Sequence, residues 1–176
     1  GKTAYIAEKM KNEGKIIAID KFETRLNILM KNLERLKVKN VLPVVADSAV
    51  YDEQKFDKIL LDAPCSGLGT LSKKPDIKWK RTYSDILRLS EIQSILIENA
   101  AKLLKPGGIL VYSTCTTLPD ENDQTIFKFL ENHKEFSIVK PDTNIPSEVV
   151  DENGFIKTFP HIHKIDGSFC VKLTKN

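Results

Sequence analysis

Three short apolar segments, each leading into an aspartate, constrain the fold of this chain most strongly. They are KIIAID (15–20), VLPVVAD (41–47) and KILL (58–61), which Asp62 follows. Between the first two, residues 23–36 carry apolar side chains at largely helical spacing. Strands that alternate with helices favour a doubly wound, mainly parallel sheet. We therefore predict an α/β fold of that class.

The remaining elements follow the same alternation. Helices are predicted at 3–12, 84–104 and 120–132, and strands at 109–114, 136–140, 155–159 and 168–173. The last two strands lie close enough in sequence to pair antiparallel, which gives the sheet an antiparallel edge. A parallel sheet of this kind needs a strand before its first helix, so we expect the first strand to be absent from this chain. Residues 1–176 are otherwise expected to form one domain.

Composition excludes some classes of protein. The apolar fraction of 41% and the charged fraction of 29% are typical of a globular chain, with no apolar run of membrane-spanning length. The three cysteines lie 50 and 55 residues apart, and no signal peptide precedes them, which favours reduced thiols in the cytoplasm. A zinc site is disfavoured, because His161 and His163, expected on a strand, have no other close ligands. The oligomeric state stays open, with a monomer favoured.

A basic segment, KKPDIKWKR (73–81), surrounds the only tryptophan of the chain, Trp79. Its cations are Lys73, Lys74, Lys78, Lys80 and Arg81. The segment is either a solvated loop or a patch that contacts phosphates. Its position just after a strand that ends at candidate active-site residues supports the second interpretation as much as the first. For Trp79 itself, we expect packing rather than stacking.

The three aspartates point to a ligand site. Parallel strands end at one edge of a sheet, so Asp20, Asp47 and Asp62 are expected to face one crevice. Asp20 follows Gly1 by 19 residues, a spacing at which a carboxylate accepts hydrogen bonds from a ribose diol. An adenosine-containing ligand is therefore favoured, but this spacing does not distinguish NAD from S-adenosylmethionine. The alternatives are that each aspartate only caps a helix or turn, or that the opening GKT ends a phosphate-binding loop.

Two cysteines follow neighbouring strands in sequence. Cys65 follows Asp62 in a turn with proline and glycine, and Cys115 follows the strand at 109–114. If the two strands are adjacent, both thiols open onto the same crevice, which favours thiolate chemistry. Which cysteine is the nucleophile stays open from geometry alone. Cys170 alternates with apolar residues inside a strand and is expected to pack.

Five motifs occur in a specific order over nearly the whole chain. They are DAPCSG (62–67), PDIKW (75–79), LKPGGILVYSTCT (104–116), PDEND (119–123) and DGSFCVKL (166–173). Together they resemble the RNA cytosine-5 methyltransferases of the Sun/Nop type. The resemblance implies a Rossmann-like class I methyltransferase fold and S-adenosylmethionine as cofactor. Mild departures are Ser168, where an aromatic residue is usual, and Asp123, where glutamate is frequent.

The resemblance also implies roles at matching positions. Gly1 and Lys2 would belong to the cofactor loop, Asp20 would hold the ribose hydroxyls and Asp47 would lie near the adenine. Asp62 would lie near both the methionine moiety and the target base.

The same resemblance separates the two thiols. Cys115 matches the nucleophile, and Cys65 matches a second cysteine that helps complete the reaction and release RNA. The expected substrate is RNA, ribosomal first and transfer RNA second, with the basic segment holding its backbone. Two rival functions stay open, namely a noncatalytic RNA-binding module and another Rossmann enzyme, such as a small-molecule methyltransferase or an NAD-dependent oxidoreductase.

Overall fold

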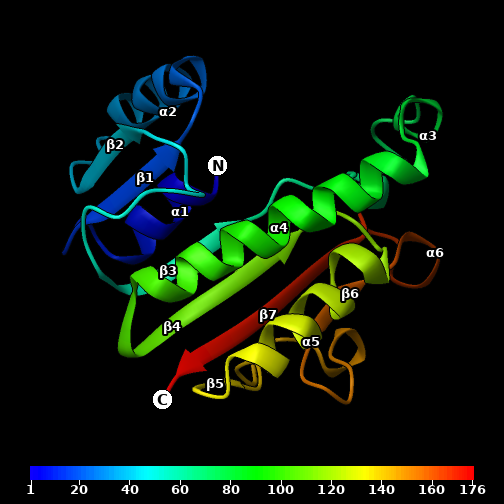
Figure 1. Ribbon diagram of the computed structural model, residues 1–176. Coiled ribbons are helices and arrows are strands. Elements are labelled where there is room, and N and C mark those ends of the chain that lie inside the picture. Colours follow the sequence, from blue (N-terminus) through cyan, green and yellow to red (C-terminus); the bar gives the residue numbers. More distant parts are fainter. The chain divides into compact units, whose positions relative to one another are not determined.

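A computed structural model describes all residues from 1 to 176, in two compact units (Figure 1). The first unit spans residues 1–51 and the second spans residues 52–176. None of the helices combines the length and the apolarity that crossing a bilayer requires. Each unit contains one parallel strand pair, as the alternating pattern predicts, and in the second unit three further strands are added through antiparallel pairing.

The first unit is a βαβ arrangement with one further helix before it. Its elements are α1 (Lys2–Lys9), β1 (Ile16–Asp20), α2 (Glu23–Arg35) and β2 (Val41–Val45). The strands are parallel, and Asp20 pairs with Val45 at their carboxyl ends. Helix α2 buries Leu26 and Leu33, seven residues apart and hence on one face of the helix.

The second unit contains a five-stranded sheet of mixed direction. Its strands are β3 (Phe56–Asp62), β4 (Leu104–Thr114), β5 (Phe136–Ile138), β6 (Ile156–Thr158) and β7 (Ser168–Lys175). The order is β3-β4-β7-β5, and β6 also pairs with β7. Strands β3 and β4 are parallel, whereas β7 is antiparallel to β4, β5 and β6. The predicted antiparallel pairing of the last two strands is confirmed, and β7 also lies inside the sheet.

Helices α4 (Tyr83–Leu103) and α5 (Asp123–Asn132) lie on one face of this sheet (Figure 1). Alternate residues of β4 and β7 face them, so that Leu110 pairs with Leu173 and Tyr112 pairs with Val171, all four side chains being buried. Cys170 lies on the opposite face of β7 and is half-buried. The core of the unit therefore forms between the sheet and the two helices.

Several boundaries differ from the sequence predictions. Strand β4 begins at Leu104 and includes the KPGG segment, and the helix predicted from 120 starts at Asp123, after a 3₁₀ turn over Pro119–Glu121. The basic segment contains a four-residue helix, α3 (Ile77–Lys80). His161 and His163 lie on a short helix, α6 (Pro160–His163), instead of the expected strand. No group of three or more His, Cys, Asp or Glu side chains is placed to hold a metal ion.

Candidate active site

The two thiols expected on one crevice lie side by side. Pairing between β3 and β4 continues one residue past the strand, where the Ala63 N–H donates to the Ser113 carbonyl at 2.9 Å. This pairing carries both following turns to the same edge of the sheet. There the sulfur atoms of Cys65 and Cys115 lie 3.2 Å apart, and the Cys115 N–H donates to the Cys65 sulfur at 3.3 Å.

The two sulfur atoms differ in environment. Cys65 is half-buried, while Cys115 is exposed. The hydrogen bond with the Cys115 sulfur raises the pKa of Cys65 well above that of a free thiol, and burial raises this pKa further. Cys65 therefore keeps its proton and can share it with the Cys115 sulfur. Cys115 is the sulfur that an incoming substrate can reach.

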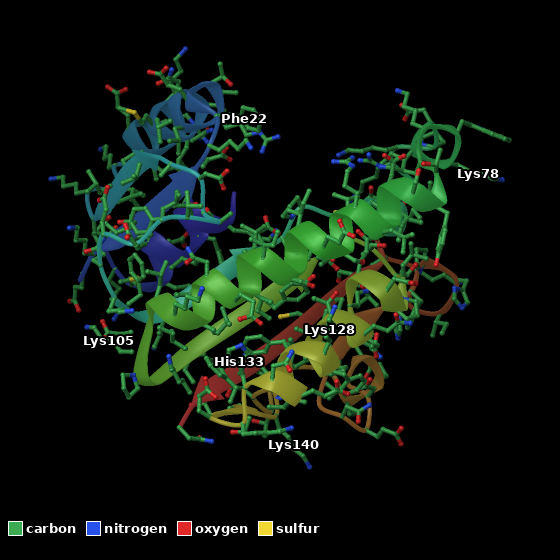
Figure 2. All side chains as sticks on the ribbon, viewed as in Figure 1. Phe22, Lys78, Lys105, Lys128, His133 and Lys140 are labelled. Carbon is green, nitrogen blue, oxygen red and sulfur yellow. The ribbon has the colours of Figure 1, made fainter.

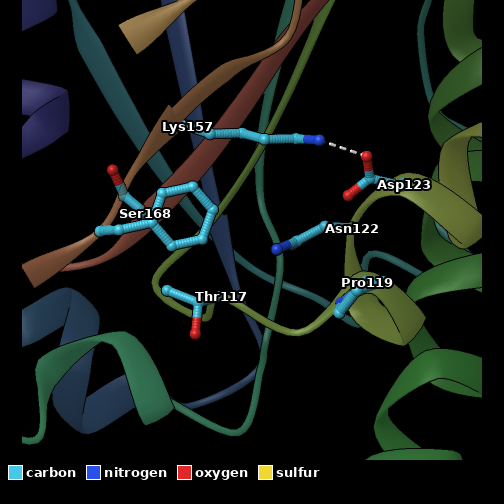
Figure 3. Close-up of a pocket in the computed structure, with 7 residues that line it drawn as sticks. Thr117, Pro119, Asn122, Asp123, Lys157 and Ser168 are labelled. Carbon is cyan, nitrogen blue, oxygen red and sulfur yellow. Dashed lines mark hydrogen bonds and ion pairs between the residues drawn. The ribbon is translucent and has the colours of Figure 1, made fainter. Parts of the chain in front are cut away.

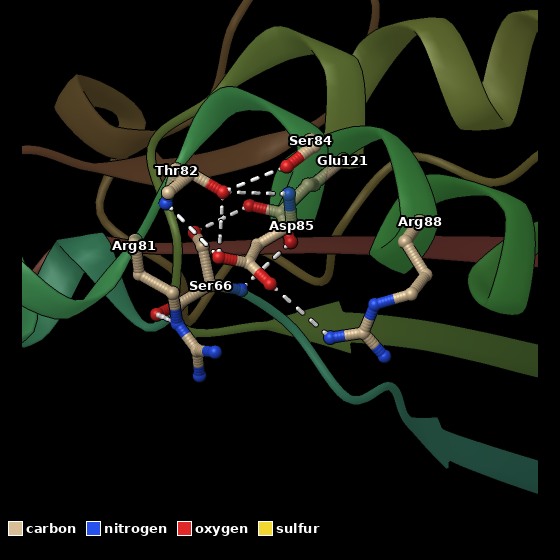
Figure 4. Close-up of polar contacts among 7 residues, drawn as sticks. All are labelled: Ser66, Arg81, Thr82, Ser84, Asp85, Arg88 and Glu121. Carbon is tan, nitrogen blue, oxygen red and sulfur yellow. Dashed lines mark hydrogen bonds and ion pairs between the residues drawn. The ribbon is translucent and has the colours of Figure 1, made fainter.

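A buried carboxylate, Glu121, holds the turn that carries Cys65 (Figure 4). Its oxygens accept hydrogen bonds from both the backbone N–H, at 2.7 Å, and the hydroxyl of Ser66. Gln93 donates to the same carboxylate at 3.1 Å and to the Pro64 carbonyl at 2.8 Å. The Tyr112 hydroxyl donates to the Glu121 carbonyl at 2.7 Å, which ties the network to β4.

Glu121 was not among the predicted site residues, although it stands inside the PDEND motif. A glutamate with no exposed surface is rare unless its oxygens are fully hydrogen-bonded. The signal that could have found it is the acid at the centre of a motif otherwise made of turn residues. Its partners lie 28 and 55 residues away in the chain, which no local pattern reveals.

Two glycines hold the turn that carries Cys115. The Gly69 N–H donates to the Cys115 carbonyl at 3.0 Å, and the Gly167 N–H donates to the Gly69 carbonyl at 2.8 Å. A Cβ on Gly69 would lie 2.1 Å from the Gly167 oxygen, so only glycine fits there. The thiol turns are thus fixed by a side-chain network at Cys65 and by backbone contacts at Cys115.

The basic segment is attached to the Cys65 turn. The Arg81 Nε–H donates to the Ser66 carbonyl at 3.1 Å (Figure 4). Ile77 packs near Gly67, where an added Cβ would lie 3.3 Å from the end of its side chain. Thr82, which follows, begins α4 with a capping box closed by Asp85. Of the predicted RNA-binding cations, Arg81 therefore faces the thiol turn.

The other cations of the segment divide into two groups. Lys73 forms an ion pair with Asp166 at 2.6 Å, and Lys80 forms one with Asp76 at 2.5 Å. Lys74 and Lys78 form no ion pair and are exposed. The expectation that Trp79 packs is wrong, because 82% of this residue is exposed. Its ring projects from a helix of one turn that has no buried residue.

Two predicted cofactor aspartates lie together in the first unit. Asp20 ends β1, and its Oδ1 accepts the Phe22 N–H at 2.9 Å, while Arg25 lies 3.5 Å from Oδ2. Asp47 follows β2 and accepts the Ala49 N–H at 2.9 Å. Each carboxylate thus holds a turn and keeps lone pairs for further donors, which fits hydroxyl or amino groups of a nucleoside. Both the turn and the ligand interpretation are compatible with this geometry.

The remaining predicted residues lie at element ends. Gly1 and Lys2 stand at the head of α1, where the Gly1 carbonyl accepts the Tyr5 N–H at 3.1 Å. Asp62 is exposed at the carboxyl end of β3, in register with Ser113 of β4 and three residues before Cys65. It belongs to the second unit, with both thiols.

A pocket of about 290 Å³ is lined by residues that follow Cys115 in the chain, the first of them Thr117 (Figure 3). Its lining residues include Thr117, Asn122, Phe159 and both positions where the motifs depart from the family pattern, Asp123 and Ser168.

In this pocket Lys157 contacts Asp123 and forms an ion pair with Asp151 at 2.8 Å. Burial opposes the charge of Lys157, but these two carboxylates outweigh it and raise its pKa. Asp123 therefore supplies one of the two carboxylates that hold the Lys157 ammonium.

Comparisons with known proteins agree with the motifs. Residues 1–174 match the 16S rRNA methyltransferase RsmB/F family. Ribosomal RNA small subunit methyltransferase B of Yersinia enterocolitica is 41% identical over 179 residues, which cover 99% of this chain and 40% of that protein. Its probable counterpart in Bacillus subtilis is 34% identical over 185 residues, covering 99% and 41%. This chain therefore spans about two fifths of the length of these relatives.

Solved structures give the same result for the fold. The crystal structure of NSun6 from Pyrococcus horikoshii with SFG has a TM-score of 0.88 and 40% identity, covering 99% of this chain and 45% of that one. The predicted Rossmann-like methyltransferase fold is confirmed by this similarity. The predicted resemblance is confirmed as well, and with it S-adenosylmethionine as the cofactor of the family.

Proposed function

Because the chain belongs to the 16S rRNA methyltransferase RsmB/F family, we propose that it methylates carbon 5 of a cytosine in RNA. Ribosomal RNA is the first candidate substrate and transfer RNA the second. The observation that carries this proposal is the pair of sulfur atoms 3.2 Å apart, one exposed and one half-buried. We also propose that the protein acts in the cytoplasm and as a monomer, as expected from the sequence.

The cofactor residues follow from the chemistry of S-adenosylmethionine, which supplies an electrophilic methyl group when bound. Asp20 is proposed to accept hydrogen bonds from the ribose hydroxyls, since its carboxylate accepts one from the Phe22 N–H and has further lone pairs available. Asp47 is proposed to lie near the adenine, and Gly1 and Lys2 to line the loop before α1. These residues bind and orient, and none takes part in bond making.

The covalent steps are assigned to the second unit. The Cys115 thiolate would add to carbon 6 of the cytosine, which makes carbon 5 nucleophilic. Carbon 5 would then take the methyl group as the methyl–sulfur bond of the bound cofactor breaks, with the electron pair of that bond staying on the sulfur. A protonated Asp62 is proposed to donate a hydrogen bond to N3 and so to draw electron density toward N3 and away from carbon 6. A base then removes the carbon 5 proton, the carbon 5–carbon 6 double bond re-forms, and the Cys115 thiolate leaves with the electrons of the C–S bond.

Cys65 is proposed to act in this last stage. Its pKa is raised chiefly by the hydrogen bond to the Cys115 sulfur. That sulfur loses its negative charge once it has bonded to carbon 6, so the main cause of the raised pKa disappears. Burial still raises this pKa, but the rise is smaller without that hydrogen bond, so Cys65 can release its proton to solvent. The Cys65 thiolate can then accept the carbon 5 proton, which couples elimination of the cytosine to formation of the adduct.

RNA that carries 5-fluorocytosine tests the proposal, because fluorine at carbon 5 prevents the final elimination and traps the covalent adduct. With S-adenosylmethionine present, the protein is expected to form an adduct stable to denaturing gel electrophoresis. Cys115→Ala abolishes the adduct. With ordinary cytosine, Cys65→Ala lets the adduct form and slows its breakdown.

The rival functions predict other outcomes of the same experiment. A noncatalytic RNA-binding module binds the labelled RNA without any adduct. A small-molecule methyltransferase or NAD-dependent oxidoreductase leaves the RNA unbound, and titration with S-adenosylmethionine and with NAD separates these two. An adduct that persists in Cys115→Ala and disappears in Cys65→Ala would exchange the roles of the two thiols.

A further inference from the structure

Helix α3 presents an aromatic ring that the residues of this chain leave largely exposed. Trp79 is 82% exposed, on a four-residue helix with no buried side chain. Lys78 Nζ lies 5.1 Å from the centre of its ring. Figure 2 shows Lys78 projecting outward from this helix, at the start of α4. Single exposed rings are common on protein surfaces, so the functional argument depends on how this ring is positioned and on the charges beside it.

The helix is nonetheless held in place on the candidate active site. Ile77 packs near Gly67, Arg81 donates to the Ser66 carbonyl, and Lys73 bridges to Asp166 at 2.6 Å. Gly67 and Ser66 are the residues that follow Cys65 in its turn. The inner side of the segment is therefore fixed to the thiol turn, and Trp79 is held at a set position relative to Cys65.

The charges beside the ring identify the kind of partner. Lys74 and Lys78 form no ion pair, whereas Lys73 and Lys80 are already matched by Asp166 and Asp76. Lysine is depleted from the centres of protein–protein interfaces, but it is the typical contact to phosphates. An exposed ring beside unmatched lysines therefore fits a single-stranded nucleic acid, whose bases stack while its backbone meets the cations.

We propose that Trp79 is a stacking platform for an unpaired base of the RNA substrate, one that flanks the target cytosine, with Lys74 and Lys78 on the adjoining phosphates. The proposal rests on the proposed function for the identity of the RNA as substrate. Target bases must leave their stack to react, and a fixed platform beside the thiol turn receives a neighbouring base that has lost its own stacking partner.

The single tryptophan makes the platform directly observable. Titration with a single-stranded oligoribonucleotide is expected to quench its fluorescence, because a base stacked on the indole quenches it. Trp79→Ala should weaken binding about tenfold, which corresponds to the loss of one base–aromatic contact. Trp79→Phe should recover part of that loss, since phenylalanine keeps a stacking face. Duplex RNA of the same sequence should quench much less.

Two controls separate stacking from charge and from folding. Tyr5→Ala removes another exposed ring with a lysine beside it, Lys9 at 5.3 Å, in the first unit, and should leave RNA affinity unchanged. Lys78→Ala should reduce the slope of log affinity against log salt by about one, while Trp79→Ala leaves that slope unchanged. Equal thermal midpoints of the variants show that each one folds.

The platform and the methyltransferase reaction fail in different ways. Trp79→Ala should slow adduct formation on 5-fluorocytosine RNA at limiting RNA and recover the parental rate at saturating RNA. Quenching by RNA without any adduct would overturn the proposed reaction and leave the platform supported. Unchanged fluorescence on RNA binding, or unchanged affinity of Trp79→Ala, would overturn the platform even if the adduct forms.

Discussion

The sulfur of Cys65 lies 3.2 Å from the sulfur of Cys115 and also receives the Cys115 backbone N–H. Two thiols in contact cannot both ionise easily, because the second negative charge would meet the first. The half-buried Cys65 is the one that keeps its proton. The arrangement thus favours the protonated form of Cys65 and leaves Cys115 as the exposed sulfur of the pair.

Alkylation rates test this division. In the unmodified protein, iodoacetamide at pH 8 is expected to label Cys115 faster than Cys65. In Cys115→Ala the main cause of the raised pKa of Cys65 is gone, so its thiolate fraction and its labelling rate should rise. Mass spectrometry of the labelled peptides measures both rates, with Cys170→Ser as background. A labelling rate of Cys65 that falls or stays equal in Cys115→Ala would contradict the proton sharing.

Removal of the Glu121 carboxylate should destabilise the second unit. Glu121→Ala leaves the buried N–H of Ser66 without its acceptor and leaves the Ser66 hydroxyl only the Thr116 Oγ1 at 2.9 Å, at a cost of about 2 kcal/mol in unfolding free energy. Glu121→Gln keeps one acceptor and should cost less. Urea unfolding measures both, and Glu91→Gln on the exposed side of α4 serves as control, with a change within about 0.5 kcal/mol. Equal stability of Glu121→Ala and Glu91→Gln would contradict the role of this carboxylate.

Two glycine substitutions distinguish the cost of a steric clash, at Gly69, from the cost of a strained backbone angle, at Gly107. Gly69→Ala places a methyl group 2.1 Å from the Gly167 oxygen and should cost about 3 kcal/mol or more, with loss of the ordered Cys115 turn. Gly107→Ala meets open space at a φ of +71° and should cost only about 1–2 kcal/mol. Thermal unfolding compares the two. If Gly69→Ala lowers the stability less than Gly107→Ala does, the backbone around Gly69 and Gly167 can shift to make room for the methyl group.

His133 should make stability depend on pH. Its ring contacts Glu98 at 2.8 Å and Glu135 at 3.1 Å, and stacks on Phe129 (the histidine is labelled in Figure 2). Burial opposes its charge, but the two carboxylates outweigh burial and raise its pKa. Because the pKa of His133 is higher in the folded state than in the unfolded state, its protonated ring stabilises the fold fully at pH values below the unfolded-state pKa. This stabilisation is lost as pH rises through the folded-state pKa.

The corresponding variant is His133→Gln. This substitution should lower the unfolding free energy more at pH 5.5 than at pH 8.5, and the two decreases should differ by roughly 0.5–1 kcal/mol. Denaturant unfolding at the two pH values measures the difference. His161→Gln is the control, since this exposed side chain forms no ion pair. The same loss at both pH values would indicate that His133 contributes only by packing.

The strands of the parallel pairs were predictable because each is a local apolar segment that ends in a turn. The meeting of Cys65 with Cys115 was predicted only on the condition that their strands are adjacent, and the pairing of β3 with β4 meets this condition. Glu121 and the position of β7 depend on partners distant in the chain, which periodicity does not report. Trp79 was expected to pack, but on the one-turn helix that carries it the half-buried Ile77, and not Trp79, packs toward Gly67. The predicted cofactor and catalytic roles were available only from the motif resemblance.

Strand β7 is the last strand in the sequence, and yet it lies between β4 and β5. The residues just before it supply the Gly167 contact that holds Gly69 and, through it, the Cys115 turn. During synthesis, the sheet of the second unit therefore cannot close until residues 168–175 have left the ribosome. Until then the Cys115 turn lacks the backbone contact that runs through Gly69 to Gly167, so a nascent chain can pair β3 with β4 before the second thiol turn is fixed.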